Sequence, residues 1–234
     1  MKIAIFSDVH GNYLNLASFL ESTEKLNIDK YICLGDLCNY YSDNEKVITL
    51  MQNKNSLCLL GNHDEFYIVN GLLTDEKKRN YNFDESLLEK KDCIDYLKSL
   101  PRKYEMNIGK NSVLFCHASP TDLLYTYIYP TTDLNQYKDL PYNFVFVGHT
   151  HRQFLKSIGN VTICNVGSIG LPRDNGSLMS FAILDTTTMD ITLYRKEIDI
   201  MKVKEAYTGK VNNDVIELLE RKEVLEFKYT LVNG

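Results

Sequence analysis

Cysteines are few in this 234-residue sequence, and no two of its six cysteines have the Cys-x-x-Cys spacing of redox and zinc sites. Four of them, Cys33, Cys58, Cys116 and Cys164, lie within apolar runs. This placement is typical of reduced cysteines that pack as small core residues in a cytoplasmic protein. We therefore expect a fold that needs no disulfide bond.

Long apolar runs and dense basic runs are also missing. The four apolar residues between Lys2 and Ser7 are too few for the apolar region of a signal peptide, and no run is long enough to cross a membrane. The net charge is -5, and Lys and Arg form no cluster that would bind nucleic acid by charge. We expect a cytoplasmic protein without a membrane contact or a stable nucleic-acid partner.

The balance of residue types is that of a folded globular protein, with 44% apolar and 24% charged residues. No internal repeat, linker or low-complexity tract divides the chain. We expect a single domain over residues 1–234. The sequence does not decide the oligomeric state, and a homo-oligomer is compatible with it.

Short apolar runs that end abruptly in polar residues or glycine predict buried strands in the first part of the chain. They cover residues 2–6, 30–34, 56–60, 113–116 and 144–147. Amphipathic helices are predicted over 14–25 and 44–52. Strands that alternate with helices are typical of a parallel or mixed buried sheet.

The pattern changes after residue 161, where strand-like runs at 161–165, 180–185 and 191–195 predict a second, more antiparallel sheet. A late helix over 212–222 and a closing strand over 223–231 are also expected. Together these elements predict an α/β fold in which two sheets form a sandwich covered by helices.

Two polar stretches, 65–101 and 121–141, are interpreted as insertions that shape a substrate pocket. The second contains Tyr125, Tyr127, Tyr129 and Tyr137. A tyrosine-rich loop can equally pack on the surface or at a dimer contact, and the sequence leaves these alternatives open.

Polar clusters follow the predicted strands at their carboxyl ends, where open α/β sheets place ligand sites. In chain order the clusters are Asp8-Val-His10, Gly35-Asp36, Gly61-Asn62-His63-Asp64, His117 and Gly148-His149-Thr-His151. Each motif alone is more often structural than functional, but their combination in this order is very improbable by chance. The donors are carboxylates, an amide and imidazoles, which suit Mn, Fe, Zn, Co or Ni, and seven ligands are enough for two ions.

This ordered set resembles the calcineurin-like metallophosphoesterase superfamily over about residues 1–174. The segment from Asn165 to Arg173, Asn-Val-Gly-Ser-Ile-Gly-Leu-Pro-Arg, is similar to one in the small bacterial phosphodiesterase-like branch. The resemblance implies a four-layer αββα sandwich of two mixed sheets flanked by helices. It also implies hydrolysis of a small phosphate ester, with a nucleotide among the substrates to consider, by a metal-bridging hydroxide.

The resemblance further implies a role for each residue. Asp8, His10 and His151 would bind one divalent ion, Asn62, His117 and His149 a second, with manganese favoured, and Asp36 would bridge them. His63 would protonate the leaving oxygen or stabilise charge on the phosphoryl group, and Asp64 could orient His63. Asn62, Ser168 and Arg173 are further candidates for substrate binding, with Arg173 equally interpretable as a surface residue, whereas Asn12 is interpreted as a helix cap.

The sequence departs from the family pattern after Asp36. Protein phosphatases and dinucleoside tetraphosphate hydrolases of the superfamily have Asp-Arg-Gly three residues later, whereas here Asn39 replaces the carboxylate and the Arg is missing. This argues against a protein phosphatase. We favour a phosphodiesterase, with a phosphomonoesterase or nucleotide phosphatase as the alternative. Two alternatives belong to other classes: a non-catalytic scaffold, like the retromer subunit that shares this fold, and a nuclease.

Overall fold

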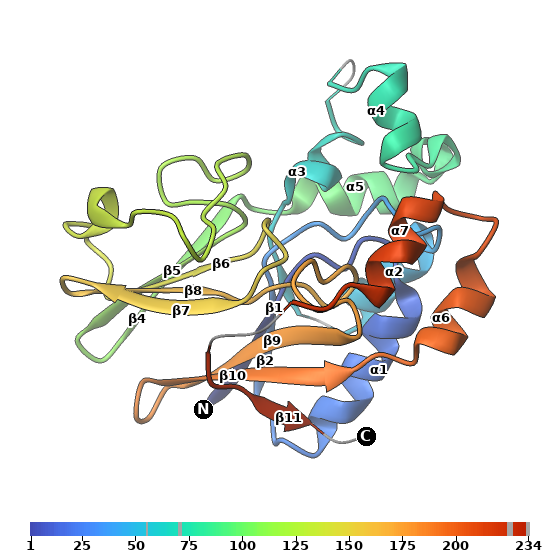
Figure 1. Ribbon diagram of the computed structural model, residues 1–234. Coiled ribbons are helices and arrows are strands. Elements are labelled where there is room, and N and C mark those ends of the chain that lie inside the picture. Colours follow the sequence, from blue (N-terminus) through green and yellow to red (C-terminus); the bar gives the residue numbers. More distant parts are fainter. Residues whose placement is uncertain (55, 70–71, 224–226, 233–234) are drawn as a thin grey trace.

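The first strand sits in the middle of a six-stranded mixed sheet. The computed structural model describes residues 1–54, 56–69, 72–223 and 227–232 (Figure 1). In spatial order the strands of this first sheet are β11 (Thr230–Val232), β10 (Asp190–Glu197), β9 (Leu178–Asp185), β1 (Lys2–Phe6), β2 (Lys30–Cys33) and β3 (Leu57–Cys58). β1, β2 and β3 are parallel, and β9 is antiparallel to β1.

A second, five-stranded sheet packs against the first. Its order is β4 (Lys103–Ile108), β5 (Asn111–Cys116), β6 (Phe144–Val147), β8 (Val161–Asn165) and β7 (Phe154–Ile158). The three inner strands are parallel, and the two edge strands are antiparallel to their neighbours. Both sheets are mixed, as predicted.

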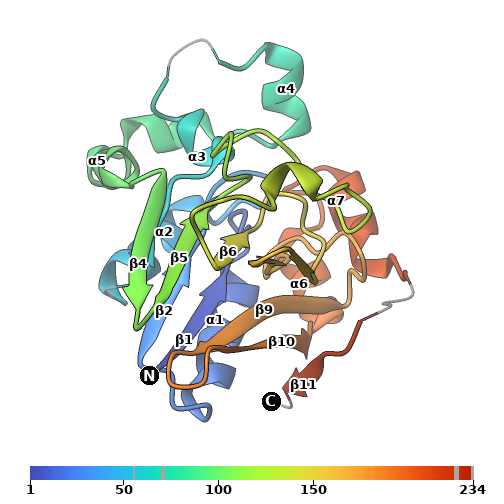
Figure 2. The same ribbon diagram turned by 90° about the vertical axis from the view of Figure 1, so that its left-hand side faces the viewer.

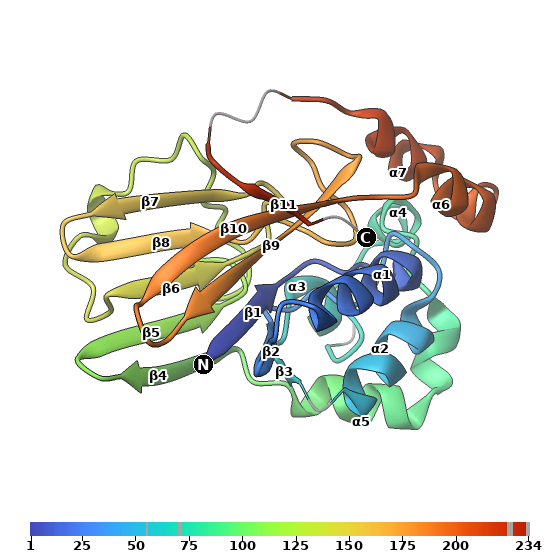
Figure 3. The same ribbon diagram turned by 90° about the horizontal axis from the view of Figure 1, so that it is seen from below.

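Side-chain alternation along the strands divides the core between the layers. In β1, Ile3 and Ile5 point into the core between the sheets, whereas Ala4 and Phe6 face the helices. The helices on that outer face are α1 (Tyr13–Glu24), α2 (Asn44–Asn53), α5 (Lys91–Ser99), α6 (Ile200–Tyr207) and α7 (Asn213–Glu217), and Figure 3 shows them away from the second sheet. The predicted α/β sandwich of two mixed sheets with flanking helices is confirmed.

The outer face of the second sheet is covered by the stretch 121–141, which contains the short helix η2 (Asn135–Tyr137). Ile128, Leu134 and Tyr137 pack there against strand residues such as Val145 and Ile163. Tyr137 is therefore a core residue, whereas Tyr125, Tyr127 and Tyr129 of the same stretch are exposed. The stretch thus has a buried part, which packs on the sheet, and an exposed part.

The other stretch, 65–101, lies over the same end of the molecule as the short helix α3 (Asn62–Glu65) (Figure 2). It contains α4 (Asp75–Asn80), η1 (Glu85–Glu89) and α5. The first two lie at the surface, and α5 packs on α2. This end is also where β1, β2 and β3 deliver their carboxyl ends.

The predicted division of strands between the sheets was wrong. β9 and β10 pair beside β1 in the first sheet, while β5, β6 and β8 together form the second. Local hydrophobic pattern carries no information about such long-range pairing, since β1 and β9 are separated by most of the chain. The edge strands β4 and β7 and the helix α6 were not predicted, and in the predicted closing strand residues 224–226 lie outside the described part.

In the described part of the chain, no helix is both long and apolar enough to cross a membrane.

Candidate metal centre

The loops that follow β1, β2, β5 and β6, together with the start of α3, bring the predicted ligands into one buried cluster. The possible ligand atoms form two groups. Within each group all atoms lie within 4.8 Å of one another, and Asp36 belongs to both groups. The first group holds Asp8, His10, Asp36 and His151, and the second holds Asp36, His117 and His149. Asn62 joins the second group, because its Oδ1 lies 3.0 Å from Nε2 of His117.

Backbone carbonyls fix which nitrogen of each histidine faces the centre. Nδ1 contacts a carbonyl oxygen in three rings: His10 to Cys38 at 2.9 Å, His151 to Leu171 at 2.7 Å and His117 to Leu34 at 3.1 Å. In His149 it is Nε2 that contacts the carbonyl oxygen of Tyr125, at 3.2 Å. A carbonyl only accepts, so the ring nitrogen beside it donates and the other nitrogen of a neutral ring presents its lone pair to the centre.

These lone pairs face one another at close range. Nε2 of His10 lies 3.0 Å from Nε2 of His151, and Nε2 of His117 lies 3.2 Å from Nδ1 of His149. Two bare nitrogens at such distances repel unless a cation or a proton lies between them. The donor set therefore fits metal ions, and imidazole nitrogen is a preferred ligand of transition metals.

The two carboxylates occupy complementary places. Oδ1 of Asp8 is buried without a hydrogen-bond partner and lies 3.4 Å from Nε2 of His151. Oδ2 of Asp36 lies 3.6 Å from Nε2 of His10 and 3.4 Å from Nε2 of His117. An orphaned buried carboxylate oxygen is costly without a cation, and a carboxylate placed between two donor groups suits a bridging role.

Burial and charge shift the pKa values of the cluster in opposite directions. Burial lowers the pKa of His10 to about 4 and that of His149 to about 3, which keeps both rings neutral and able to bind metal. Burial raises the pKa of the Asp8 carboxyl to about 7. Burial opposes the charged form of His117, but the charge and hydrogen bond of Asp36, together with the charges of Asp8 and Asp64, outweigh it and raise that pKa to about 9.

Strained backbone marks the same loops. Of the ten described non-glycine residues with positive φ, seven are at this cluster: Asp8, His10, Asp36, Asn39, Tyr40, His149 and His151. Positive φ costs about 1 kcal/mol or more for a residue with a side chain and concentrates at functional sites. The strain therefore indicates a site selected for its geometry rather than for stability.

Two motif glycines are required by close approach. A Cβ on Gly61 would lie 2.1 Å from Oδ1 of Asp36, and a Cβ on Gly148 would lie 2.6 Å from Oδ2 of Asp8. Both distances are far inside van der Waals contact. The glycines thus let neighbouring strands bring the two carboxylates into the centre.

Asp64 has a different role from the predicted one. Its carboxylate accepts hydrogen bonds from four backbone N–H groups: Asp36 at 2.8 Å, Leu37 at 2.9 Å, Cys38 at 3.2 Å and Gly61 at 3.0 Å. The interpretation that Asp64 orients the His63 ring was wrong, because both oxygens face the loop after β2. Asp64 holds that loop, and Asp36 with it, against α3.

Ser168 is fully buried and is not a substrate-binding residue, contrary to the prediction. Its hydroxyl donates to the carbonyl oxygen of Asp8 at 2.7 Å and accepts from the N–H of Leu171 at 2.7 Å. It therefore supports the loop of Asp8. Asn12 caps α1 as predicted, since its side chain accepts from the N–H of Asn15.

His63 lies beside the cluster in an aromatic surrounding. Its ring centroid is 4.6 Å from Tyr81, 5.0 Å from Tyr40 and 5.2 Å from Phe66. Arg173 donates to the hydroxyl of Tyr40 at 3.1 Å, which places its guanidinium near the centre. These three aromatic residues were missed in the sequence, because nothing in the motifs indicates that distant loops cover His63.

A second aromatic group lies against His149. The ring of Tyr127 stacks on His149 with centroids 4.0 Å apart, and Tyr129 stacks on Tyr127 at 5.6 Å. Both tyrosines keep more than 40% of their surface exposed. The stretch 121–141 thus contacts a predicted ligand through Tyr127, and its pocket-shaping role stays a prediction.

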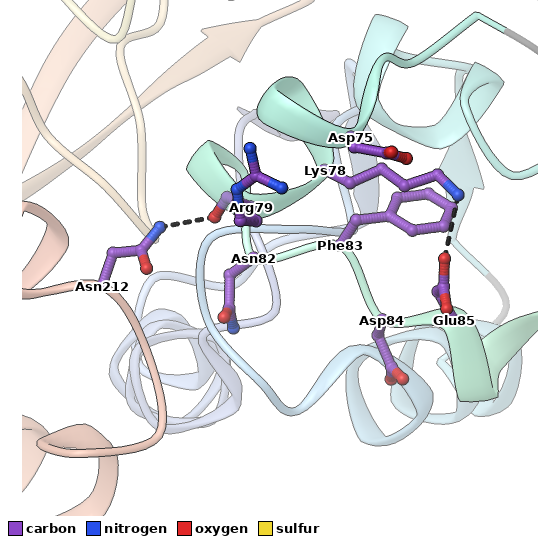
Figure 4. A pocket seen from close by; sticks show the side chains of 8 residues that line it. All are labelled: Asp75, Lys78, Arg79, Asn82, Phe83, Asp84, Glu85 and Asn212. Carbon is purple, nitrogen blue, oxygen red and sulfur yellow. Dashed lines mark hydrogen bonds and ion pairs between the residues drawn. The ribbon is translucent and has the colours of Figure 1, made fainter.

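A surface pocket of about 650 Å³ opens beside α4 (Figure 4). Lys78 pairs with Glu85 on one side of it, and Asn212 donates to the carbonyl oxygen of Arg79 on the other. None of the eight residues that line it is a predicted ligand. It lies next to Tyr81 in the chain but outside the metal cluster.

Known proteins share this chain's sequence pattern and fold. A family model described as the calcineurin-like phosphoesterase superfamily domain matches residues 1–189. An uncharacterised protein of Methanocaldococcus jannaschii is 33% identical over 239 aligned positions, which cover 93% of this chain and 95% of that protein.

Solved structures share the fold. A hypothetical protein of Pyrococcus horikoshii has a TM-score of 0.78 at 22% identity, covering 95% of this chain and 99% of its own. A metallophosphoesterase of Sphaerobacter thermophilus has a TM-score of 0.74 at 24% identity, covering 94% and 98%. With the family model and the archaeal relative spanning most of its length, the chain belongs to the calcineurin-like phosphoesterase superfamily.

Proposed function

We propose that the chain is a binuclear metal-dependent phosphodiesterase that hydrolyses a small phosphodiester. The observation that carries the proposal is the convergence of imidazole lone pairs and two carboxylates into two donor groups that share Asp36. The family supplies the coarser statement that the enzyme is a metal-dependent phosphoric ester hydrolase.

In this proposal the two ions are held by the predicted residues. Asp8, His10 and His151 would hold the first ion, Asn62, His117 and His149 would hold the second, and Asp36 would serve both. When bound, two such ions lower the pKa of water and stabilise charge on the oxygens at phosphorus. The chain's own task is to hold these ligands rigidly, which the carbonyl contacts of the four rings support.

The surroundings of the cluster favour a diester over a monoester. A phosphodiester carries one charge and two substituents, whereas a monoester carries up to two charges and one substituent. The charge of Arg173 reaches His10 and His151. Aromatic rings also lie against two histidines of the site, Tyr40 against His63 and Tyr127 against His149. The aromatic surface suits a second organic substituent such as a nucleoside.

The donor set favours manganese among the candidate ions, because it combines carboxylate and amide oxygens with imidazole and lacks thiolate. All six cysteines are buried and unpaired, which supports a reducing, cytoplasmic setting. We therefore include a small phosphodiester substrate and a cytoplasmic location in the proposal.

The test is hydrolysis of a bis(nitrophenyl) phosphodiester and of the matching monoester by chelator-stripped protein, with Mn, Ni, Co, Zn and Mg restored one at a time. We expect no activity without metal, recovery with manganese, and faster turnover of the diester. Faster turnover of the monoester would indicate a phosphomonoesterase. Inert protein with two ions bound, shown by elemental analysis, would contradict the proposal and favour a scaffold.

A further inference from the structure

A chain of hydrogen bonds leads from the stretch 65–101 to the ring of His63. The backbone N–H of Asp84 donates to the hydroxyl oxygen of Tyr67 at 3.0 Å. The hydroxyl of Tyr67 donates to Oδ1 of Asn39 at 2.7 Å. The amide nitrogen of Asn39 then lies 3.1 Å from Nδ1 of His63.

The direction of this chain is set at its first link. A backbone N–H only donates, so the Tyr67 oxygen accepts there and its single hydrogen is directed to Asn39. The atom of Asn39 that receives it must be the oxygen, which leaves the NH₂ group facing His63. An NH₂ group only donates, so Nδ1 of His63 accepts and the hydrogen of the neutral ring sits on Nε2.

Burial and packing keep the direction from being reversed. Asn39 is fully buried, and Tyr67 and His63 are 4% and 6% exposed. The N–H of Asn39 donates to Oδ1 of Asn44 at 2.8 Å, and the ring of Tyr67 stacks on Phe83 at 4.3 Å. A flipped Asn39 amide would leave the buried Tyr67 hydroxyl without an acceptor, which is costly.

We propose that Asn39, directed by Tyr67 and the N–H of Asp84, is a positioning residue that holds His63 as a neutral ring with its hydrogen on Nε2. Resting on the proposed phosphodiesterase function, this assigns His63 the role of a hydrogen-bond donor to an oxygen at phosphorus. A neutral imidazole gives up its remaining proton very poorly, so the leaving oxygen departs as an anion and is protonated by water. The enzyme therefore selects diesters whose leaving oxygen departs readily.

A carboxylate at position 39 would impose the opposite arrangement. It only accepts hydrogen bonds, so it requires a hydrogen on Nδ1 and favours the doubly protonated, cationic ring, which is a proton donor. Asn39→Asp is therefore the variant that tests the proposal. Asn82→Asp is the matched control, because it adds the same carboxylate to the half-buried turn next to Tyr81 and outside the hydrogen-bond chain.

The direct test is nitrogen-15 NMR of histidine-labelled, zinc-loaded protein, in which the signals of His63 are those lost in His63→Gln. We expect Nδ1 of His63 to be bare and Nε2 to carry hydrogen in the wild type and in Asn82→Asp, and Nδ1 to carry hydrogen in Asn39→Asp. A hydrogen on Nδ1 in the wild type overturns the proposal, and this outcome does not depend on how the variant folds. An unchanged ring in a folded Asn39→Asp also overturns it.

The kinetic test is a series of aryl phosphodiesters that differ in the acidity of the released phenol. We expect the rate ratio between nitrophenyl and unsubstituted phenyl esters to fall at least about tenfold in Asn39→Asp and to stay unchanged in Asn82→Asp. An equal ratio in all three proteins overturns the proposed role. Inactivity of every protein toward every ester would contradict the phosphodiesterase proposal instead, while the NMR result on His63 would stand.

Discussion

At the scale of single residues, Asp36 has the central position of the proposed centre. Its Oδ2 lies between Nε2 of His10 and Nε2 of His117, at 3.6 and 3.4 Å. Its Oδ1 accepts from the N–H of His63 at 2.9 Å. One carboxylate therefore contacts both donor groups and the start of α3.

Asp36→Asn is expected to weaken binding of both ions, because the amide keeps the shape of the side chain but loses its negative charge. We expect the affinity for manganese to fall at least about 100-fold, since even residues outside the ligand shell contribute 10 to 100-fold. Isothermal titration of metal into stripped protein measures it. The exposed Asp190→Asn should bind as the wild type does; equal affinities of the two variants would contradict the bridging role.

His63→Ala, unlike Asp36→Asn, should impair turnover without impairing metal binding. The His63 ring is outside both donor groups, so we expect bound metal to be retained, while turnover falls about 10²- to 10³-fold, as for loss of one hydrogen-bond donor at developing charge. His63→Gln should recover part of the loss, because its amide also donates. Metal content by elemental analysis and turnover on the same samples decide the question, and loss of metal from His63→Ala would make His63 a ligand.

The sequence predicted that these residues come together, because they follow strands in recognisable motifs. It could not predict Tyr67 or Tyr81, whose contacts with Asn39 and His63 depend on how an insertion folds back over the site. It also misassigned Asp64 and Ser168, because a polar residue next to a motif has the same sequence signal whether it binds substrate or a backbone loop.

At the scale of elements, the loop after β2 depends on α3. The carboxylate of Asp64, at the third position of α3, accepts from three successive N–H groups of that loop. The loop contains Asp36 and Asn39, both with positive φ. Its strained conformation is therefore maintained by an acceptor from another element.

Asp64→Asn replaces one of these acceptor oxygens by an NH₂ group that faces N–H donors. We expect the metal-free protein to lose about 1 to 3 kcal/mol of unfolding free energy, because buried donors are left without partners. Urea denaturation measures the loss. The exposed Asp95→Asn serves as control and should stay within about 0.5 kcal/mol of the wild type. An Asp64→Asn protein as stable as this control would show that the loop holds itself.

Elements were predicted better than their assembly. Most strands and both early helices follow from local apolar patterns, but the sheet that each strand joins does not. β9 lies beside β1 because Ile183 pairs with Ala4, a contact between residues 179 positions apart (183 − 4) that no local pattern encodes. Edge strands such as β4 were missed because one of their faces is exposed.

At the scale of the whole molecule, the candidate metal ligands come from both sheets. Asp8, His10 and Asp36 follow strands of the first sheet, whereas His117 and His149 follow strands of the second. Side chains also link the sheets without metal. Buried Arg195 of β10, in the first sheet, donates to Gln153, the residue before β7 of the second sheet, and pairs with Asp174. Metal binding should therefore stabilise the fold as a unit.

The stabilisation by metal should depend on pH in a defined direction. In the metal-free protein the pKa of Asp8 is raised to about 7 and that of His117 to about 9, so both hold protons that a metal must displace. The pKa values of His10 and His149 are lowered to about 4 and about 3, so these rings stay unprotonated throughout. Metal affinity should thus rise with pH from about 6 to about 9.

The measurement is the melting temperature with and without manganese at about pH 6 and about pH 8.5. Free metal at 100 times its dissociation constant adds about 2.7 kcal/mol, or about 5 to 10 °C for a chain of this size. We expect a gain of this order at the higher pH and a smaller one at the lower pH. Comparing the gain at each pH removes any pH effect on the metal-free fold. Because Asp36→Asn lacks the shared ligand, manganese should raise its melting temperature only slightly at both pH values. If manganese raised the melting temperature of the wild type equally at the two pH values, Asp8 and His117 would not hold those protons.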